Sequence, residues 1–118
     1  MILVDTSVWV EHFRTGNIGL EAVLQNGQVA CHPFIIGELA CGNLRNRTTI
    51  LSLLQDLPTC IRARDEEVIP FIEEHRLMGK GLGYIDIHLL MSSRLTGLPL
   101  WTLDKRLHEA ATAIFRNH

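Results

Sequence analysis

Short apolar runs alternate along the chain with longer segments whose apolar residues recur at helical spacing. The short runs predict strands at 2–4, 28–32, 59–63 and 98–103. The longer segments predict helices at 6–14, 18–26, 33–42, 48–57, 65–78, 84–95 and 104–113. Pro33 suits the first turn of its helix, whereas Pro70 predicts a kink. The apolar residues 113–115 are a candidate fifth strand at the sheet edge.

This alternation predicts the α/β class, because strands separated by helices form a largely parallel sheet with helices on both faces. We expect a mostly parallel sheet of four to five strands in a three-layer α/β/α arrangement. A chain of 118 residues is long enough for one domain and short for two, so residues 1–118 are expected to form a single domain.

Composition limits the possible settings and partners. A net charge of −2 indicates that bulk charge would not hold a nucleic acid, so binding would need local cations or metal ions. No apolar stretch approaches the roughly 20 residues that span a bilayer, and the N-terminus lacks the basic region of a signal peptide. Three cysteines without a CxxC motif predict buried free thiols in a reducing cytosol.

Four carboxylates stand in apolar surroundings, unlike the other acidic residues, which have polar neighbours. Asp5 directly follows the first predicted strand and Asp104 the last. Glu38 lies within an apolar helix, and Asp86 lies between two isoleucines near a helix start. Ligands of parallel α/β sheets gather at the carboxyl ends of the strands, so we expect the four side chains to converge there.

Convergence of these carboxylates would favour a hard cation. Two charges about 5 Å apart repel by roughly 3 kcal/mol at an effective dielectric constant near 20. Oxygen ligands select Mg²⁺ or Mn²⁺ over zinc. The chemistry expected of such a centre is metal-assisted hydrolysis of a phosphodiester bond.

Each carboxylate also has an ordinary structural interpretation. Asp5 and Asp104 both precede helical segments and could cap them. Asp86 could be held by backbone amides near the start of its helix. Glu38 is harder to explain, because a carboxylate in the middle of an apolar helix needs a partner, for which Arg94 is a candidate.

Four motifs together resemble those of a known family. They are DTSVW after the first strand, the glutamate in FIIGELACG, GLGYIDIHLL, and LWTLDKRL, and they cover essentially the whole chain in the order of the family. They resemble PIN-domain ribonucleases, and most closely the toxins of bacterial VapBC toxin–antitoxin pairs. The combination of a YID-type helix with LWTLDKRL is the most specific part of the resemblance.

The resemblance implies a Rossmann-like PIN fold and an endoribonuclease that depends on Mg²⁺ or Mn²⁺. It implies an acidic catalytic quartet of Asp5, Glu38, Asp86 and Asp104. The three aspartates would bind metal, and Glu38 would bind metal or orient the attacking water. Hydroxyl groups that steady the site would come from Thr6 and Thr102.

The resemblance also implies partners and a location. The substrate would be RNA, with tRNA and other structured RNA as candidates, and the inhibitor would be a VapB-type antitoxin. A homodimer in the cytoplasm is expected.

Other motifs receive ordinary roles. The stretch 79–83, GKGLG, lacks the order of a phosphate-binding loop and is interpreted as a turn. His88 lies about 200° round the helix from Asp86, which predicts a packing or surface role. The context of a nucleophilic serine is missing around Ser7, Ser92 and Ser93.

Two further sets of side chains have two interpretations each. Five basic residues could contact RNA phosphates or belong to solvated loops and helix starts: Arg45, Arg47, Lys80, Lys105 and Arg106. Trp9 and Phe13 share a helix face at i, i+4 spacing, which indicates core packing first and a groove for an antitoxin helix second.

Two rival functions were weighed. A receiver-like phosphoacceptor domain would need an acidic residue at the end of the middle strand, and 59–63 has none. It would also need a lysine at the end of the last strand, so this function is rejected. A non-catalytic α/β protein-binding module with structural helix caps is the alternative hypothesis. It predicts no divalent binding and an Asp86→Asn effect on stability alone.

Overall fold

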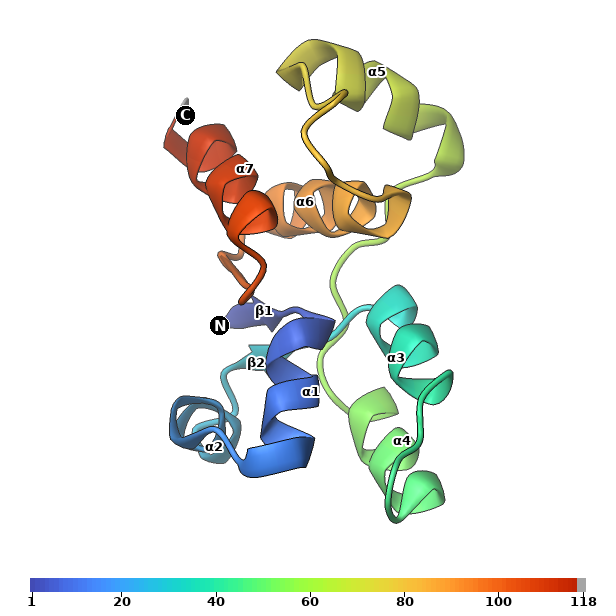
Figure 1. Ribbon diagram of the computed structural model, residues 1–118, viewed down its shortest axis with the longest axis vertical. Helices are drawn as coiled ribbons and strands as arrows, with labels where there is room; N and C mark the ends of the chain where they lie inside the picture. Colours follow the sequence, from blue (N-terminus) through green and yellow to red (C-terminus); the bar gives the residue numbers. More distant parts are fainter. Residues whose placement is uncertain (117–118) are drawn as a thin grey trace.

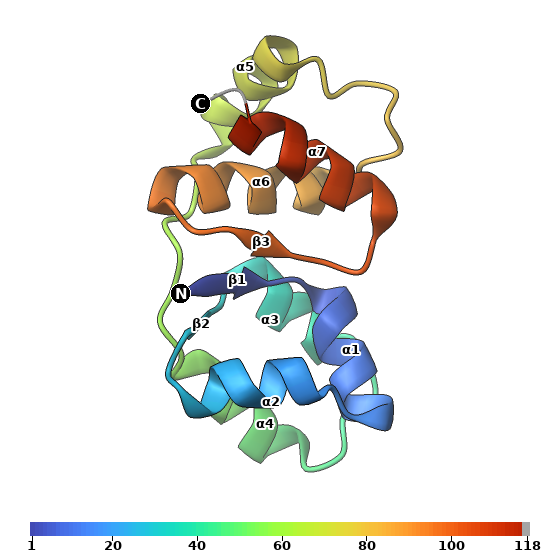
Figure 2. The same cartoon turned by 90° about the vertical axis from the view of Figure 1, so that its left-hand side faces the viewer.

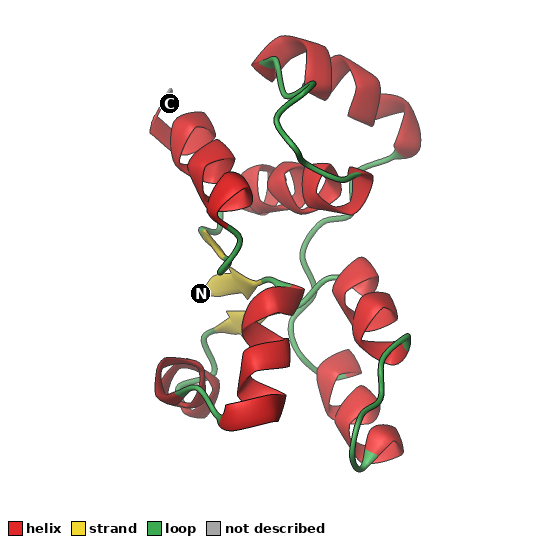
Figure 3. Cartoon of the chain, viewed as in Figure 1, coloured by secondary structure: helices red, strands yellow, loops and turns green. Residues whose placement is uncertain are grey.

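The N-terminal apolar run forms β1 (Ile2–Val4), the central strand of a parallel sheet. The structure, a computed structural model, describes residues 1–116, and over this range the sheet has three strands in the order β2–β1–β3 (Figure 3). β2 is Val29–Ala30 and β3 is Leu100–Trp101. The chain therefore crosses to opposite sides of β1, and such a switch in strand order is where open α/β sheets bind ligands.

Seven helices cover the sheet within the described range. They are α1 (Thr6–Thr15), α2 (Ile18–Gln25), α3 (Pro33–Ala40), α4 (Arg47–Gln55), α5 (Asp65–His75), α6 (Tyr84–Thr96) and α7 (Lys105–Arg116). Helices α1 to α4 lie on one side of the sheet, and α6 and α7 lie on the other, with α5 outside α6 (Figures 1 and 2). This arrangement confirms the predicted α/β class with three layers. No helix in residues 1–116 is long and apolar enough to cross a membrane.

The core is organised around α6, which is buried on nearly all sides. Residues 87–93 of this helix are all buried, because α6 contacts β3, α5 and α7. A helix that is enclosed in this way is expected to be apolar around its whole circumference. The isoleucines that flank Asp86 therefore reflect the position of α6 within the molecule.

The sheet has fewer strands than the sequence predicts. The segment 59–63 contributes only a parallel bridge between Thr59 and Cys31. The Cys60 amide still donates to the Cys31 carbonyl at 2.9 Å, but the Ile61 amide donates to the Thr96 hydroxyl at 2.9 Å, so the pairing ends there. The fifth strand predicted at 113–115 is also wrong, because α7 continues through these residues. Its buried positions keep helical spacing: Leu107, Ala110, Ala111 and Ile114.

The helix boundaries match the sequence prediction within about three residues, and no predicted helix is divided. Helix α5 runs through Pro70 as one element, so the predicted kink does not divide it. It ends earlier than predicted because Arg76 adopts a left-handed conformation with φ of 52°. The Leu77 amide then bonds back to the Ile72 carbonyl at 3.0 Å, which closes the helix end.

The three cysteines are free thiols. Cys31 and Cys60 are buried, as predicted, and burial raises the pKa of Cys31 to about 11. Burial also raises the pKa of the Cys60 thiol. Cys41 is exposed at the end of α3, so the prediction of burial is wrong for this residue.

A buried histidine joins α3 to α6. Nδ1 of His32 accepts the Phe34 amide at 3.0 Å and so caps α3. Nε2 must therefore carry the proton in the neutral ring, and it donates to the Ser92 hydroxyl at 3.0 Å. Burial lowers the pKa of His32 to about 4, with smaller contributions from His88 and Arg62.

Because the folded pKa of His32 lies below the unfolded value of 6.5, the unfolded chain takes up the proton first as the pH falls. Its contribution to stability is complete above about pH 6.5 and is lost progressively toward pH 4. We expect His32 to remove about 2 kcal/mol from the unfolding free energy between pH 7 and pH 5. Urea unfolding of the wild type and of His32→Asn at the two pH values checks this; an equal pH dependence in both would contradict it. His108→Asn is the exposed-histidine control.

Candidate active site

Asp5 connects the ends of two neighbouring strands. It follows β1 directly and is buried. Its Oδ2 accepts hydrogen bonds from the hydroxyls of Ser7 and Thr102, each at 2.7 Å. Thr102 follows β3 closely, and the Asp5 amide donates to the Trp101 carbonyl at 2.9 Å. One carboxylate oxygen is thus fixed at the point where the strand order switches.

Glu38 enters the same neighbourhood from α3. The Thr6 hydroxyl, in the first turn of α1, donates to Glu38 Oε1 at 2.7 Å. Glu38 is exposed, although the sequence predicts an apolar setting for it. Arg94, the predicted candidate partner, contacts His75 instead, at 3.2 Å. The two threonines predicted to steady the site therefore contact two different members of the quartet.

Asp86 lies in the first turn of α6, where its Oδ2 accepts the Gly83 amide at 2.8 Å. Burial raises the pKa of Asp86, and the negative charges of Asp5 and Asp104 raise it further. The hydrogen bond from Gly83 acts in the opposite direction. Asp86 therefore lies close enough to Asp5 and Asp104 to be affected by their charges.

Asp104 caps α7. Its Oδ1 accepts the Leu107 amide at 3.0 Å, and its own amide donates to the Thr102 hydroxyl at 3.0 Å. Thr102 therefore contacts both Asp5 and Asp104, and it fixes the start of α7 relative to the end of β1. The side chain of Asp104 is exposed.

Three helices thus begin at the site, and each presents its positive end to a carboxylate: α1 to Asp5, α6 to Asp86 and α7 to Asp104. Each such contact stabilises a negative charge by about 0.3–1 kcal/mol. Within residues 1–116, only one oxygen of each aspartate accepts a hydrogen bond from the protein. Each aspartate can therefore cap a helix and contribute negative charge to the site at the same time.

These oxygen atoms fit a hard divalent cation better than a soft one. The described part of the chain has no three Asp, Glu, His or Cys side chains close enough together to enclose a metal ion directly. Mg²⁺ keeps several waters and often contacts only one or two carboxylates in proteins. The oxygens left free by the caps, Asp5 Oδ1 and Asp86 Oδ1 among them, are the atoms that could contact such a hydrated ion.

The chain was compared with known proteins. No family model matches it. It is similar to Ribonuclease VapC32 of Mycobacterium tuberculosis, in strains CDC 1551 / Oshkosh and ATCC 25618 / H37Rv. Each is 44% identical over 111 residues, which cover 93% of this chain and 90% of the relative. The chain belongs to the VapC family of PIN-domain ribonucleases. This confirms the resemblance predicted from the four motifs.

Ser7 is a site residue that the sequence analysis missed. The hydroxyl of Ser7 donates to Asp5 and accepts the Leu103 amide at 3.0 Å, so it links α1 to the segment after β3. The sequence context indicates only that Ser7 is not a nucleophile. The available signal was its place two residues after Asp5 in DTS, in the first turn of the helix that Asp5 precedes.

The basic residues divide between structural and site positions. Arg47 donates through both Nη atoms to the carbonyls of Ala40 and Gly42 at the end of α3, which is a structural role. Lys80 lies against the C-terminal half of α7, and Arg45 lies beside the C-terminal half of α1. Of the five basic residues predicted as possible RNA-phosphate contacts, only Lys105 and Arg106 follow Asp104 directly in the sequence.

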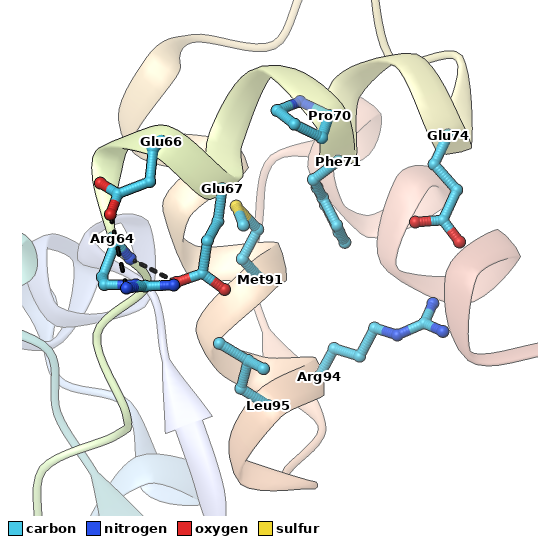
Figure 4. A pocket seen from close by; sticks show the side chains of 9 residues that line it. All are labelled: Arg64, Glu66, Glu67, Pro70, Phe71, Glu74, Met91, Arg94 and Leu95. Carbon is cyan, nitrogen blue, oxygen red and sulfur yellow. Dashed lines mark hydrogen bonds and ion pairs between the residues drawn. The ribbon is translucent and has the colours of Figure 1, made fainter.

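A cavity of about 450 Å³ lies between α5 and α6, separate from the acidic quartet (Figure 4). Arg64 forms ion pairs here: its Nη1 lies 3.5 Å from Glu66 Oε1, and its Nε lies 3.2 Å from Glu67 Oε1. Arg94 lines this cavity as well, which explains why it is not available to Glu38. No member of the quartet lines the cavity.

We expect Asp86→Asn to raise the unfolding free energy without metal, because burial and the charges of Asp5 and Asp104 raise the pKa of Asp86 and so disfavour its charged form in the folded state. The asparagine oxygen can still accept the Gly83 amide. Thermal unfolding at neutral pH in EDTA measures the change, with Glu109→Gln on α7 as the exposed control. A lower melting temperature for Asp86→Asn would contradict the proposed repulsion.

Proposed function

We propose that this VapC-family protein is an endoribonuclease that hydrolyses RNA phosphodiester bonds with Mg²⁺ or Mn²⁺. Asp5, Glu38, Asp86 and Asp104 form its catalytic quartet in this proposal. It acts in the cytoplasm as the toxin of a type II toxin–antitoxin pair, with residues 1–118 as one PIN domain. The observation that carries the proposal is the meeting of three carboxylates at three helix starts, each with an oxygen left free.

Bound metal would supply charge neutralisation at the phosphate and activation of a water molecule. The protein side chains hold the reacting groups. Asp5 is immobilised by Ser7 and Thr102, so its free oxygen has a fixed position. Glu38 Oε1 is occupied by Thr6, which leaves Oε2 to orient the attacking water or to accept its proton. Asp86 and Asp104 complete the negative surface that a divalent ion would occupy.

Arg106 is the residue placed best for a substrate phosphate. It lies in the first turn of α7, two residues after Asp104. It packs on the turn before α6, since a Cβ added at Gly81 would lie 2.4 Å from its Nη1. Gly81 has a φ of +76°, a conformation that favours glycine. A guanidinium in this position can bind a phosphate oxygen beside the quartet.

The test is cleavage of structured cellular RNA, tRNA included, by purified protein with Mn²⁺ or Mg²⁺. Asp5→Asn and Asp86→Asn are each expected to lower the cleavage rate by about 100-fold or more, because they remove charge from the metal site. EDTA is expected to stop cleavage. Glu109→Gln on the outside of α7 should cleave as the wild type does.

Full activity of the Asp5→Asn, Asp86→Asn double variant would overturn the proposed site. If no RNA is cut and Mn²⁺ leaves the melting temperature of the wild type unchanged, the non-catalytic binding module becomes the better hypothesis.

An apolar groove supports the proposed antitoxin partner. The groove lies between α1, α2 and α4 and has a volume of about 420 Å³. Trp9 is buried in its floor and stacks on the half-buried Phe13 with 5.8 Å between ring centroids. The rim includes Leu53, which is 59% exposed. Both interpretations of the Trp9–Phe13 pair therefore have support: Trp9 belongs to the core, and Phe13 extends it to the surface.

We expect Leu53→Glu to weaken binding of an inhibitory VapB-type antitoxin by about tenfold or more, because a charge would face an apolar helix in the groove. Ile18→Glu, at an exposed apolar position outside the groove, is the matched control. Titration calorimetry measures both, and the cleavage rate without antitoxin should be unchanged. Equal affinity of Leu53→Glu and the wild type would place the antitoxin elsewhere. Light scattering of the same samples would test the proposed homodimer.

A further inference from the structure

Aromatic and cationic side chains meet near the starts of α3 and α6 and take no part in the proposed hydrolysis. Tyr84 comes from the first turn of α6 and Phe34 from the first turn of α3. Arg62 comes from the segment between the Thr59 bridge and α5. The guanidinium carbon of Arg62 lies 4.6 Å from the centre of the Phe34 ring.

His88 holds these rings in place. Its ring centroid lies 4.8 Å from those of both Phe34 and Tyr84, in edge-to-face contacts of 76° and 74°. His88 is fully buried, and neither ring nitrogen has a hydrogen-bond partner in the part of the chain that the structure describes. The nearest carboxylate oxygen, Asp65 Oδ1, is 3.7 Å from Nε2. His88 therefore serves as an aromatic support, in agreement with the predicted packing role.

The outer members of this group face solvent. Tyr84 is 53% exposed, and Arg62 is exposed as well. Core packing explains the inner position of His88 but gives no reason for an open tyrosine ring beside an arginine that lies over a phenylalanine. Exposed aromatic rings and guanidinium planes are the surfaces on which unpaired nucleobases stack. The positive charge of Arg62 also suits a neighbouring phosphate.

The group adjoins two members of the quartet. Phe34 lies one helical turn before Glu38 on the same face of α3. Tyr84 begins α6 directly after Gly83, whose amide binds the carboxylate of Asp86, and its side chain lies on the His88 face of the helix, about 200° round from Asp86. An RNA strand that passes from the quartet round the start of α6 would bring an adjacent base to Tyr84 and Arg62.

We propose that Tyr84, Phe34 and Arg62 form a stacking subsite for an unpaired base of the RNA substrate, next to the bond that is cut. The proposal rests on the proposed catalytic role of Asp5 and Asp86. It favours single-stranded segments and loops of RNA over a continuous double helix, whose bases are already stacked. Since the chain has a net charge of −2, base stacking supplies affinity that bulk charge does not.

The experiment measures binding by fluorescence anisotropy, with Ca²⁺ in place of Mg²⁺ and the integrity of the RNA checked on a gel. The probes are a labelled oligoadenylate and an abasic chain of the same length. Tyr84→Ala and Tyr84→Leu are each expected to raise the Kd for oligoadenylate about tenfold and to leave the Kd for the abasic chain within about twofold. Tyr84→Phe should bind as the wild type does. Arg62→Ala should weaken binding of both probes, because it removes stacking and charge.

Phe115→Ala on α7 and Arg14→Ala on α1 are the matched exposed controls and should change neither Kd. The subsite is overturned if Tyr84→Ala and Tyr84→Leu bind oligoadenylate as tightly as the wild type. It is also overturned if they lose affinity for both probes equally. Cleavage by Asp86→Asn is measured separately, and full activity of this variant would overturn the proposed catalytic site. The anisotropy result alone decides whether a base stacks on Tyr84.

Discussion

The acidic site depends on the position of Asp5, one oxygen of which accepts hydrogen bonds from two hydroxyl groups. Ser7 comes from the helix after β1, and Thr102 comes from the segment after β3. These bonds fix the distance between the two strand ends where the strand order switches. The donors are neutral, so they orient the carboxylate without cancelling its charge. The site is consequently ordered and negative at once, which is the condition for binding a cation.

Helix starts contribute the second part of the arrangement. Asp5, Asp86 and Asp104 each satisfy a backbone amide at the start of a helix, and each helix presents its positive end in return. Capping and catalysis are often treated as competing explanations of an acidic residue. Here the cap occupies one oxygen and leaves the other free, so a single residue serves both purposes. The burial of α6 then fixes the position of Asp86 in its first turn.

Most of the fold follows from hydrophobic periodicity, because the helices have strong amphipathic or fully apolar patterns. The failures occurred where a local contact outweighed the pattern. The segment 59–63 has strand-like composition, yet the Ile61 amide bonds to the Thr96 side chain. The quartet was predicted because carboxylates in apolar runs are unusual. The role of Ser7 could not be predicted in this way, because its second contact, with Leu103, depends on tertiary structure.

Arg47, the first residue of α4, binds the last carbonyls of α3 and the loop after it. The two helices are therefore coupled mechanically at this end. Helix α3 carries Glu38, whereas α4 forms a wall of the apolar groove. A protein that shifts α4 when it enters the groove would carry Glu38 with it and alter the site from a distance. Inhibition would then require no contact between the inhibitor and a carboxylate.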